Sequence, residues 1–131
     1  MSAGNIAQIT PFMHVPDINA ALSWFSLLGF KPAFRADNYA YVSRDTVSVR
    51  VLESTQEDCA PFPPHGGFAY YVDVRDVLVI FDEIAPRLRR AGVEFHELKD
   101  QEYGQREFMI RAPDGNVFVF GQAIPEGEKN G

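Results

Sequence analysis

The chain has 131 residues, of which 46% are hydrophobic and 23% are charged, and its formal net charge is −6. This length suits one domain with one buried core. An acidic chain lacks the basic face that nucleic-acid binding needs, which excludes that class of partner. The acidity suits a cationic small ligand, or it serves solubility alone.

The cysteine content indicates which cellular compartment suits the chain. Cys59 is the single cysteine, so neither an internal disulfide nor a cysteine-based metal cluster is expected. A reducing cytoplasm is the natural setting for such a chain. Residues 1–10 lack a basic region followed by an apolar stretch, and no apolar run approaches ~18 residues. We therefore expect neither a signal peptide nor a membrane span.

The first half of the chain alternates between strand and helix patterns. Residues 6–14 alternate and are rich in β-formers, which predicts a strand. Asp17 is placed to cap a helix over 18–28, which Gly29 ends in a left-handed conformation. Further strands are expected at 30–34, 39–42 and 46–52.

The same order returns after a proline-rich linker at 54–66. Residues 67–73 alternate as a strand, and an apolar stripe predicts a helix over 77–91 that ends at Gly92. Pro86 lies inside this helix and is expected to kink or split it. The remaining strands are expected at 93–96, 106–111 and 116–120.

The chain therefore reads as β-α-β-β-β, a linker, and β-α-β-β-β again. This is an internal structural repeat carried by the order of elements rather than by residue identity. We expect a single domain over 1–131, in which module one spans about 6–53 and module two about 67–121. The linker is 54–66 and the tail is 122–131.

Three stretches carry a resemblance to a known family. They are PFMHVPDINAALSWFSLLGF at 11–30, the strand-helix segment at 70–93, and YGQREFMIRAPDGNVFVFG at 103–121. Together they resemble the vicinal oxygen chelate superfamily, which includes glyoxalase I, extradiol dioxygenases, fosfomycin resistance enzymes and bleomycin resistance proteins. The chain is most similar to the bleomycin resistance protein-like group. Ala112 departs from the Asp-Pro-Asp-Gly-Asn hairpin that is usual in the family.

The resemblance implies an α+β fold. Two βαβββ modules would form curved mixed sheets around a U-shaped cleft, with helices on the convex side. In small members of the bleomycin resistance type a second subunit completes the cleft. A homodimer, often with exchanged halves, is therefore the expected assembly, with no nucleic-acid or membrane partner.

Enzymes of the superfamily hold a divalent ion with His and Glu side chains in the cleft. Carried onto this sequence, the ligand positions fall at Thr10, at Ser48 or Arg50, at Gly67 and at Val119. These side chains cannot form a first coordination shell, because Zn²⁺ requires His, Cys or carboxylate and harder ions require several oxygens. We therefore expect no metal and no cofactor at this site.

Alternation along each strand assigns residues to a helix-packed face or to the cleft. The candidate ligand-binding residues on the cleft side are Phe12, His14, Arg50, Tyr71, Glu107, Met109 and Arg111. Glu107 and Glu53 would meet a cation, or they would pair with Arg50 and Arg111 in an architectural role. His14 is a ligand-contacting or acid/base group, or an ordinary hydrogen-bonded histidine. No catalytic residue is assigned.

Three functions are consistent with these residues. The leading one is a metal-independent protein that sequesters a small, cationic and aromatic compound, such as an antibiotic, in a cleft at a dimer interface. The alternative is a glyoxalase- or dioxygenase-type lyase or isomerase, with a displaced metal site on His14 and Glu53 or Glu107. The third is a dimerising module without a small ligand.

Overall fold

The computed structural model describes residues 4–54 and 67–128. The predicted linker therefore lies outside the described residues apart from Ser54, and so does Cys59. The elements in chain order are β1 (Phe12–Val15), α1 (Ile18–Leu27), β2 (Lys31–Arg35), β3 (Tyr39–Arg44), β4 (Val47–Glu53), β5 (Ala69–Asp73), α3 (Val77–Ala91), β6 (Lys99–Asp100), β7 (Gln105–Arg111), the 3₁₀ turn η1 (Pro113–Gly115), β8 (Val117–Ala123) and η2 (Glu126–Glu128).

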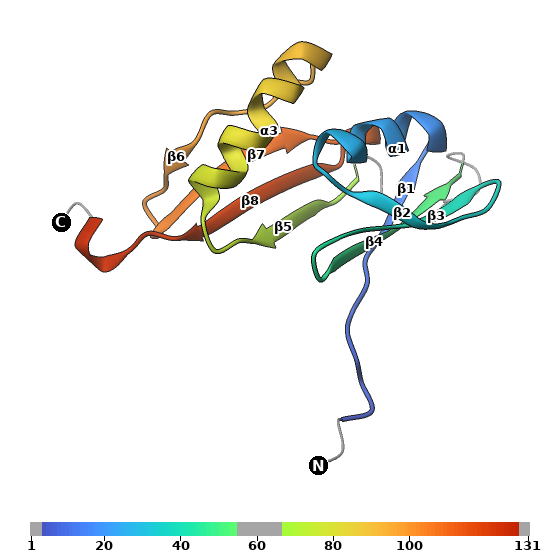
Figure 1. Ribbon diagram of the computed structural model, residues 1–131, viewed down its shortest axis with the longest axis horizontal. Helices are drawn as coiled ribbons and strands as arrows, with labels where there is room; N and C mark the ends of the chain where they lie inside the picture. The colour runs from blue at the N-terminus through green and yellow to red at the C-terminus, as the bar shows by residue number, and fades with distance from the viewer. Residues whose placement is uncertain (1–3, 55–66, 129–131) are drawn as a thin grey trace.

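Each half of the chain builds a four-stranded mixed sheet. The strand orders are β1-β4-β3-β2 and β5-β8-β7-β6, so corresponding strands occupy corresponding places. In each sheet the first and last strands of the module pair in parallel, and the other neighbours are antiparallel. Helices α1 and α3 lie on the same side of the two sheets (Figure 1). The predicted α+β fold of two βαβββ modules is confirmed.

The ends of α1 follow the sequence prediction and add one contact. Asp17 Oδ1 accepts the backbone N–H of Ala20 at 3.1 Å, and Gly29 has a φ of 81°. Glu53 Oε2 also accepts the backbone N–H of Ile18 at 2.9 Å. Because Glu53 ends β4, this bond fixes the start of the helix to the sheet and satisfies one of its exposed donors.

The second helix also keeps its predicted ends. Asp76 Oδ1 accepts the N–H of Val79 at 3.3 Å, and Gly92 ends the helix with a φ of 70°. Pro86 does not split α3, which is continuous from 77 to 91. The residues around the proline are buried on one face, as Ile84, Ala85 and Leu88 show, and this packing offsets one missing backbone hydrogen bond.

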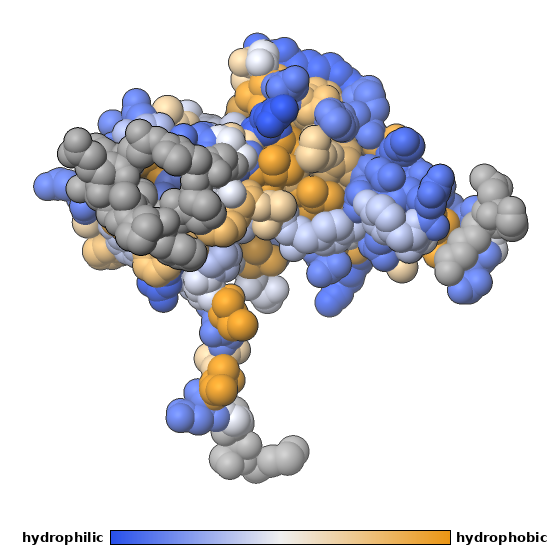
Figure 2. Space-filling view, turned by 180° about the vertical axis from the view of Figure 1, so that it is seen from behind, coloured by the Kyte–Doolittle hydropathy of each residue, from blue (hydrophilic) through white to orange (hydrophobic). Residues whose placement is uncertain are grey.

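The predicted strand at 6–14 is wrong in its first part, because β1 begins only at Phe12. Residues 4–10 extend away from the body of the protein and have no place in the β1–β4 register (Figures 1 and 2). Ile6 and Ile9 are 89% and 92% exposed. Their alternation gave the correct local pattern, but a strand also needs a neighbouring strand to bond with.

The predicted strand at 93–96 is also wrong. It reduces to an isolated bridge between Phe95 and Ile110. The edge strand forms later, as β6, where Lys99 faces Glu107 and Asp100 faces Arg106. Two charged residues show no apolar alternation, so the sequence pattern does not reveal this strand.

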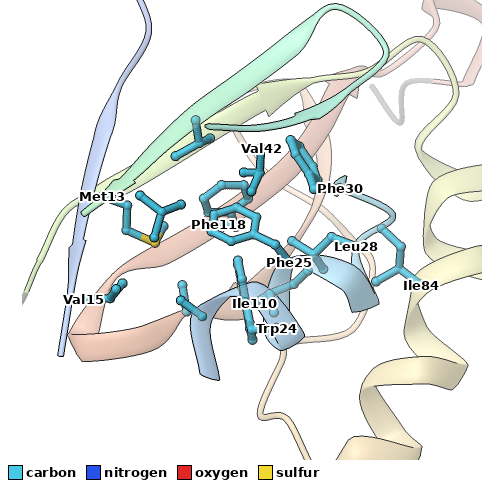
Figure 3. Packing of buried hydrophobic residues seen from close by; sticks show 14 of the residues in the cluster. Met13, Val15, Trp24, Phe25, Leu28, Phe30, Val42, Ile84, Ile110 and Phe118 are labelled. Atoms are coloured by element: carbon cyan, nitrogen blue, oxygen red, sulfur yellow. The ribbon is translucent and has the colours of Figure 1, made fainter. Parts of the chain in front are cut away.

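A single cluster of buried side chains joins the two modules. Phe118 of β8 is 1% exposed, and its ring centroid lies 5.2 Å from that of Trp24 and 5.6 Å from that of Phe25. Figure 3 shows these rings packed between α1 and the sheets. Trp24 Nε1 also donates to the carbonyl of Arg111 at 2.9 Å. The first helix therefore packs on both halves of the chain.

Polar contacts reinforce this joint. Arg44 of β3 forms a two-pronged ion pair with Glu83 of α3, at 2.8 and 2.9 Å, and also donates to the Leu28 carbonyl at 2.8 Å. The Tyr70 hydroxyl of β5 donates to the Phe12 carbonyl of β1 at 2.8 Å. These contacts fix the two sheets relative to each other and so position their open faces.

Candidate functional site

Strand alternation places the predicted ligand-binding residues on the sheet faces that the helices do not cover. On β1 and β4, Met13 and Val51 are fully buried, whereas Phe12 and Arg50 point the opposite way. The residues fall into two groups. The first face, on β1, β3 and β4, carries Phe12, His14 and Arg50, and the second face, on β5, β7 and β8, carries Tyr71, Glu107, Met109 and Arg111.

Glu107 is the central residue of the second face. It is only 9% exposed, although it lies on the side of β7 away from the helix. Its Oε1 atom accepts a hydrogen bond from the Tyr103 hydroxyl. Its Oε2 atom is buried and has no hydrogen-bond partner among the described residues. A buried carboxylate oxygen without a partner is costly, because it loses its water and gains nothing in return.

Tyr71 covers this carboxylate from the neighbouring side. Its side chain lies across Gly121, the residue that faces Glu107 in the β7–β8 register. A β-carbon at 121 would overlap the Tyr71 hydroxyl and approach Glu107 Cβ to 3.0 Å. The Tyr71 hydroxyl donates to Gln105 Oε1 at 3.1 Å. The absence of a side chain at Gly121 therefore allows the phenol to lie against the acidic residue.

The electrostatics of the two tyrosines reflect this carboxylate. Partial burial, followed by the proximity of the Glu107 carboxylate, raises the pKa of Tyr71 above its ordinary value. The hydrogen bond to Glu107 is the main cause that raises the pKa of Tyr103. Apart from burial, the two shifts share one cause, because the nearby Glu107 carboxylate disfavours a phenolate. The same charge favours a positively charged group at this place.

The rest of the second face is less polar. Met109 faces Val119 across the β7–β8 ladder, which gives an apolar floor beside Glu107. Arg111 lies at the far end of β7, and its Nε pairs with Glu94 Oε2 at 3.0 Å. Both of these side chains are largely exposed. The architectural pair that the sequence suggested for Arg111 therefore exists, but with Glu94 in place of Glu107.

Arg50 is the central residue of the first face. Its Nη1 donates to the Tyr39 hydroxyl at 2.6 Å, and its guanidinium carbon lies 4.9 Å from the centre of the Tyr41 ring. Phe12 is its direct neighbour on β1. Arg50 does not pair with Glu53, because that carboxylate caps α1 instead.

His14 stands beside this group. Its Nδ1 atom lies 2.9 Å from Ser54 Oγ, and its ring centroid is 6.3 Å from that of Phe12. A hollow of about 290 Å³ lies between the two sheets, and Tyr71 is the predicted ligand-binding residue that lines it. Gln8 and Ser48 line it from the first module, and Tyr70 and Tyr71 from the second.

The residues present do not fit a metal ion at the positions that the family uses. Thr10 accepts from Gln8 Nε2, Ser48 contacts Ser43 Oγ at 3.0 Å, and Val119 is apolar. Within the described ranges no group of three or more His, Cys, Asp and Glu side chains could hold an ion. The displaced site on His14 with Glu53 or Glu107 is therefore not assembled by the described residues of one chain.

Comparisons with known proteins agree with this architecture. The family model of the Glyoxalase/Bleomycin resistance protein/Dioxygenase superfamily matches residues 5–120. The chain belongs to this superfamily. A comparison with curated proteins gave no match.

Solved structures of superfamily proteins share the fold. A bleomycin resistance determinant encoded on the transposon Tn5 superposes with a TM-score of 0.70 at 17% identity, covering 90% of this chain and 98% of that one. The bleomycin-binding protein of Streptomyces verticillus, complexed with copper(II)-bleomycin, gives 0.69 at 22% identity, with coverages of 95% and 100%. A glyoxalase/bleomycin resistance protein from Catenulispora acidiphila DSM 44928 gives 0.66 at 24%, with 89% and 97%.

Sequence reasoning missed several residues of these faces. Tyr39 and Tyr41 alternate with the buried Ala40 and Val42, so the period-two pattern could have placed them beside Arg50. Tyr103 precedes β7 in a turn, where no periodic pattern exists to show that it contacts Glu107.

Proposed function

We propose that this protein binds a small cationic and partly aromatic compound without the help of a metal ion. The observation that carries the proposal is the Glu107 carboxylate, which is buried, lacks a hydrogen-bond partner at Oε2 within the described part of the chain, and is flanked by two tyrosine side chains. Such a group lowers the stability of the protein, and groups of this kind are concentrated in sites where a ligand supplies the missing partner. The action is therefore retention of the ligand, as in sequestration of an antibiotic, rather than its conversion.

The chemistry of the second face selects the ligand. An ammonium or guanidinium group would hydrogen-bond with Glu107 Oε2 after Tyr103, which is 67% exposed, moves aside. The ring of Tyr71 offers a face for cation–π contact and for stacking with an aromatic group. The net charge of −6 would attract a cation over longer distances.

A second copy of the chain completes the cleft in this proposal. Both sheet faces are open in a single chain, and apolar side chains remain exposed beside them, notably Ile6, Ile9 and Phe12. A dimer would cover these side chains and enclose the ligand, which raises affinity by excluding water. We place the protein in the cytoplasm because a single cysteine suits a reducing compartment. No helix of the described ranges is long and apolar enough to cross a membrane.

Two probes test the proposal by calorimetric titration after dialysis against EDTA. One is metal-free bleomycin, chosen because two solved proteins of the same fold are bleomycin-binding proteins in complex with bleomycin or its copper(II) form. The other is naphthylmethylammonium, which retains only the cation and the aromatic ring. At least one probe should bind the chelated protein, and Glu107→Gln should weaken that binding roughly tenfold or more, as expected for a lost charged hydrogen bond.

Glu97→Gln is the matched control, because it removes the same charge from an exposed carboxylate that pairs with Arg89. Its affinity for both probes should equal that of the wild type. Binding of naphthylmethylammonium alone would retain the function and reject an antibiotic of the bleomycin class. Binding that disappears on chelation and returns with one divalent ion, or no binding of either probe, would overturn the proposal.

A further inference from the structure

We propose that Arg50 forms a second subsite, on the first face, which binds the carboxylate of an aromatic acid. This inference deepens the proposed function and rests on it in one respect, since it takes the open faces as ligand-binding surfaces. It adds a subsite whose charge is opposite to that of the Glu107 site. The two subsites can be tested separately, because their charges are opposite and they lie on different sheets.

Two tyrosines contact the Arg50 guanidinium, and neither neutralises its charge. The hydrogen bond to Tyr39 and the contact with the Tyr41 ring fix its plane over the sheet. Among the described residues no carboxylate lies within ion-pair distance of it. A guanidinium has several further N–H donors, and it binds a planar carboxylate through two parallel hydrogen bonds.

Other arginines of the same chain show what an architectural role looks like. Arg44 holds Glu83 with both terminal nitrogens, and Arg106 is bonded to Asp100 and Glu128. In an acidic chain such partners are easily supplied. Arg50 differs because its partners are two phenol rings, which orient a cation without cancelling its charge.

Aromatic side chains surround this cation. Phe12 is 48% exposed, and its ring centroid lies 6.5 Å from that of Tyr39. Phe34 is 57% exposed and lies 6.1 Å from the same ring. These rings provide apolar area next to a fixed charge, the combination that orients a flat aromatic anion.

The pKa of Tyr41, which lies beside Arg50, is consistent with a surrounding that favours negative charge. Hydrogen bonds from Ser48 and then Gln8 are the main causes that lower the pKa of Tyr41, and the charge of Arg50 adds the smallest contribution. The hydroxyl of Tyr41 thus lies where negative charge is favoured, whereas both tyrosines at Glu107 lie where it is disfavoured. We commit to a carboxylate because one guanidinium balances one negative charge, and a phosphate dianion would exceed it.

The test uses probes that differ only in charge. Naphthoate and its neutral isostere naphthamide are titrated into the wild type and into Arg50→Gln, and naphthylmethylammonium serves as the probe for Glu107. Naphthoate should bind the wild type at least about tenfold more tightly than Arg50→Gln, the loss expected for a charged pair. Naphthamide should bind both proteins equally. Arg35→Gln, an exposed arginine of the same sheet, controls for net charge and should bind naphthoate like the wild type.

A second variant covers the case in which Arg50→Gln unfolds. Tyr39→Phe removes the hydroxyl that orients Arg50 and leaves the charge, so it should weaken naphthoate several-fold and leave naphthamide unchanged. Equal binding of naphthoate and naphthamide, or naphthoate binding unaffected by both variants, overturns the inference. Naphthylmethylammonium binding that depends on Glu107 would then still sustain the proposed function. Naphthoate binding that depends on Arg50, without binding of naphthylmethylammonium, would support the Arg50 subsite and contradict the proposed function.

Discussion

Tyr71 and Gly121 are complementary: the phenol of Tyr71 occupies the space that a side chain at 121 would fill. This relationship holds Tyr71 beside Glu107, and it gives a substitution that alters the site while sparing most of the core. Gly121→Ala adds a methyl group that the flexible end of Tyr71 can avoid by rotating away.

We expect Gly121→Ala to fold and to weaken naphthylmethylammonium binding about fivefold, which corresponds to roughly 1 kcal/mol of lost contact with the ring. The measurements are calorimetric titration and a thermal melt. Gly127→Ala is the control, because a β-carbon there meets open space. Unchanged affinity in Gly121→Ala would show that Tyr71 does not take part in binding.

The ion pair between Arg44 and Glu83 should couple the two modules energetically. A double-mutant cycle with Arg44→Gln and Glu83→Gln, followed by urea unfolding, should give a coupling of about 1 kcal/mol because the pair is two-pronged and partly buried. The cycle for Arg89 and Glu97, whose side chains are 53% and 69% exposed, should give less than about 0.5 kcal/mol. Equal couplings in the two cycles would contradict the joint that we describe.

The ion pair between Arg44 and Glu83 also predicts how the unfolding free energy changes at acid pH. The Arg44 hydrogen bond lowers the pKa of Glu83 below its ordinary value of 4.5. A carboxylate with a depressed pKa contributes stability that is present above the unfolded-state pKa and is lost as the pH falls through the folded-state pKa. Below about pH 4.5 the difference in unfolding free energy between wild type and Glu83→Gln should therefore shrink. A difference that stays constant down to strong acid would be inconsistent with the pair.

The raised pKa of Tyr70 predicts that the unfolding free energy decreases as the pH rises in the alkaline range, whereas the contribution of Glu83 is lost in acid. Burial raises its pKa from 10.0 to about 12, so the folded state keeps this hydroxyl protonated where the unfolded state ionises. The stability that Tyr70 supplies is complete below 10.0 and is lost as the pH rises towards about 12.

Tyr70→Phe removes that ionisation together with the hydrogen bond to the Phe12 carbonyl. At neutral pH the variant should lose about 1 kcal/mol of unfolding free energy. The deficit should narrow as the pH rises above 10.0, because only the wild type has this group to titrate. Denaturant unfolding across this range measures it, and a deficit that widens would have the wrong sign.

Phe118 should be the most sensitive ring of the core, because it packs on Trp24, Phe25 and Tyr70 at once. Phe118→Leu should cost about 1–3 kcal/mol of unfolding free energy through lost ring contacts and a residual cavity. Phe34→Leu, at a 57% exposed ring, should change it by less than about 0.5 kcal/mol. Similar costs at both positions would contradict the placement of the core.

Local patterns predicted most of the fold. The cap at Asp17 and the left-handed glycines at 29 and 92 follow from backbone chemistry that operates over a few residues. The prediction failed where the outcome depended on a neighbour. Ile6 and Ile9 alternate like a strand but find no partner, and Lys99–Asp100 form a strand because β7 lies beside them.

The candidate residues were assigned to faces by the period-two rule, and their role in ligand binding stays a prediction. Their partners were not predictable in the same way. Glu53 caps α1, Arg111 meets Glu94, and Tyr103 reaches Glu107 from a turn. Each of these contacts depends on the path of a loop or on a side-chain rotamer, which hydrophobic periodicity does not encode.

The central claim is that a buried carboxylate, and not a metal ion, holds the ligand. The most direct measurement is a crystal structure of the protein with para-bromobenzylammonium, in which the anomalous signal of bromine locates the compound. We expect the ammonium within hydrogen-bond distance of Glu107 Oε2 and the bromophenyl ring against Tyr71. A metal ion coordinated by three or more protein side chains on the open faces, or the compound bound away from Glu107, would contradict the account.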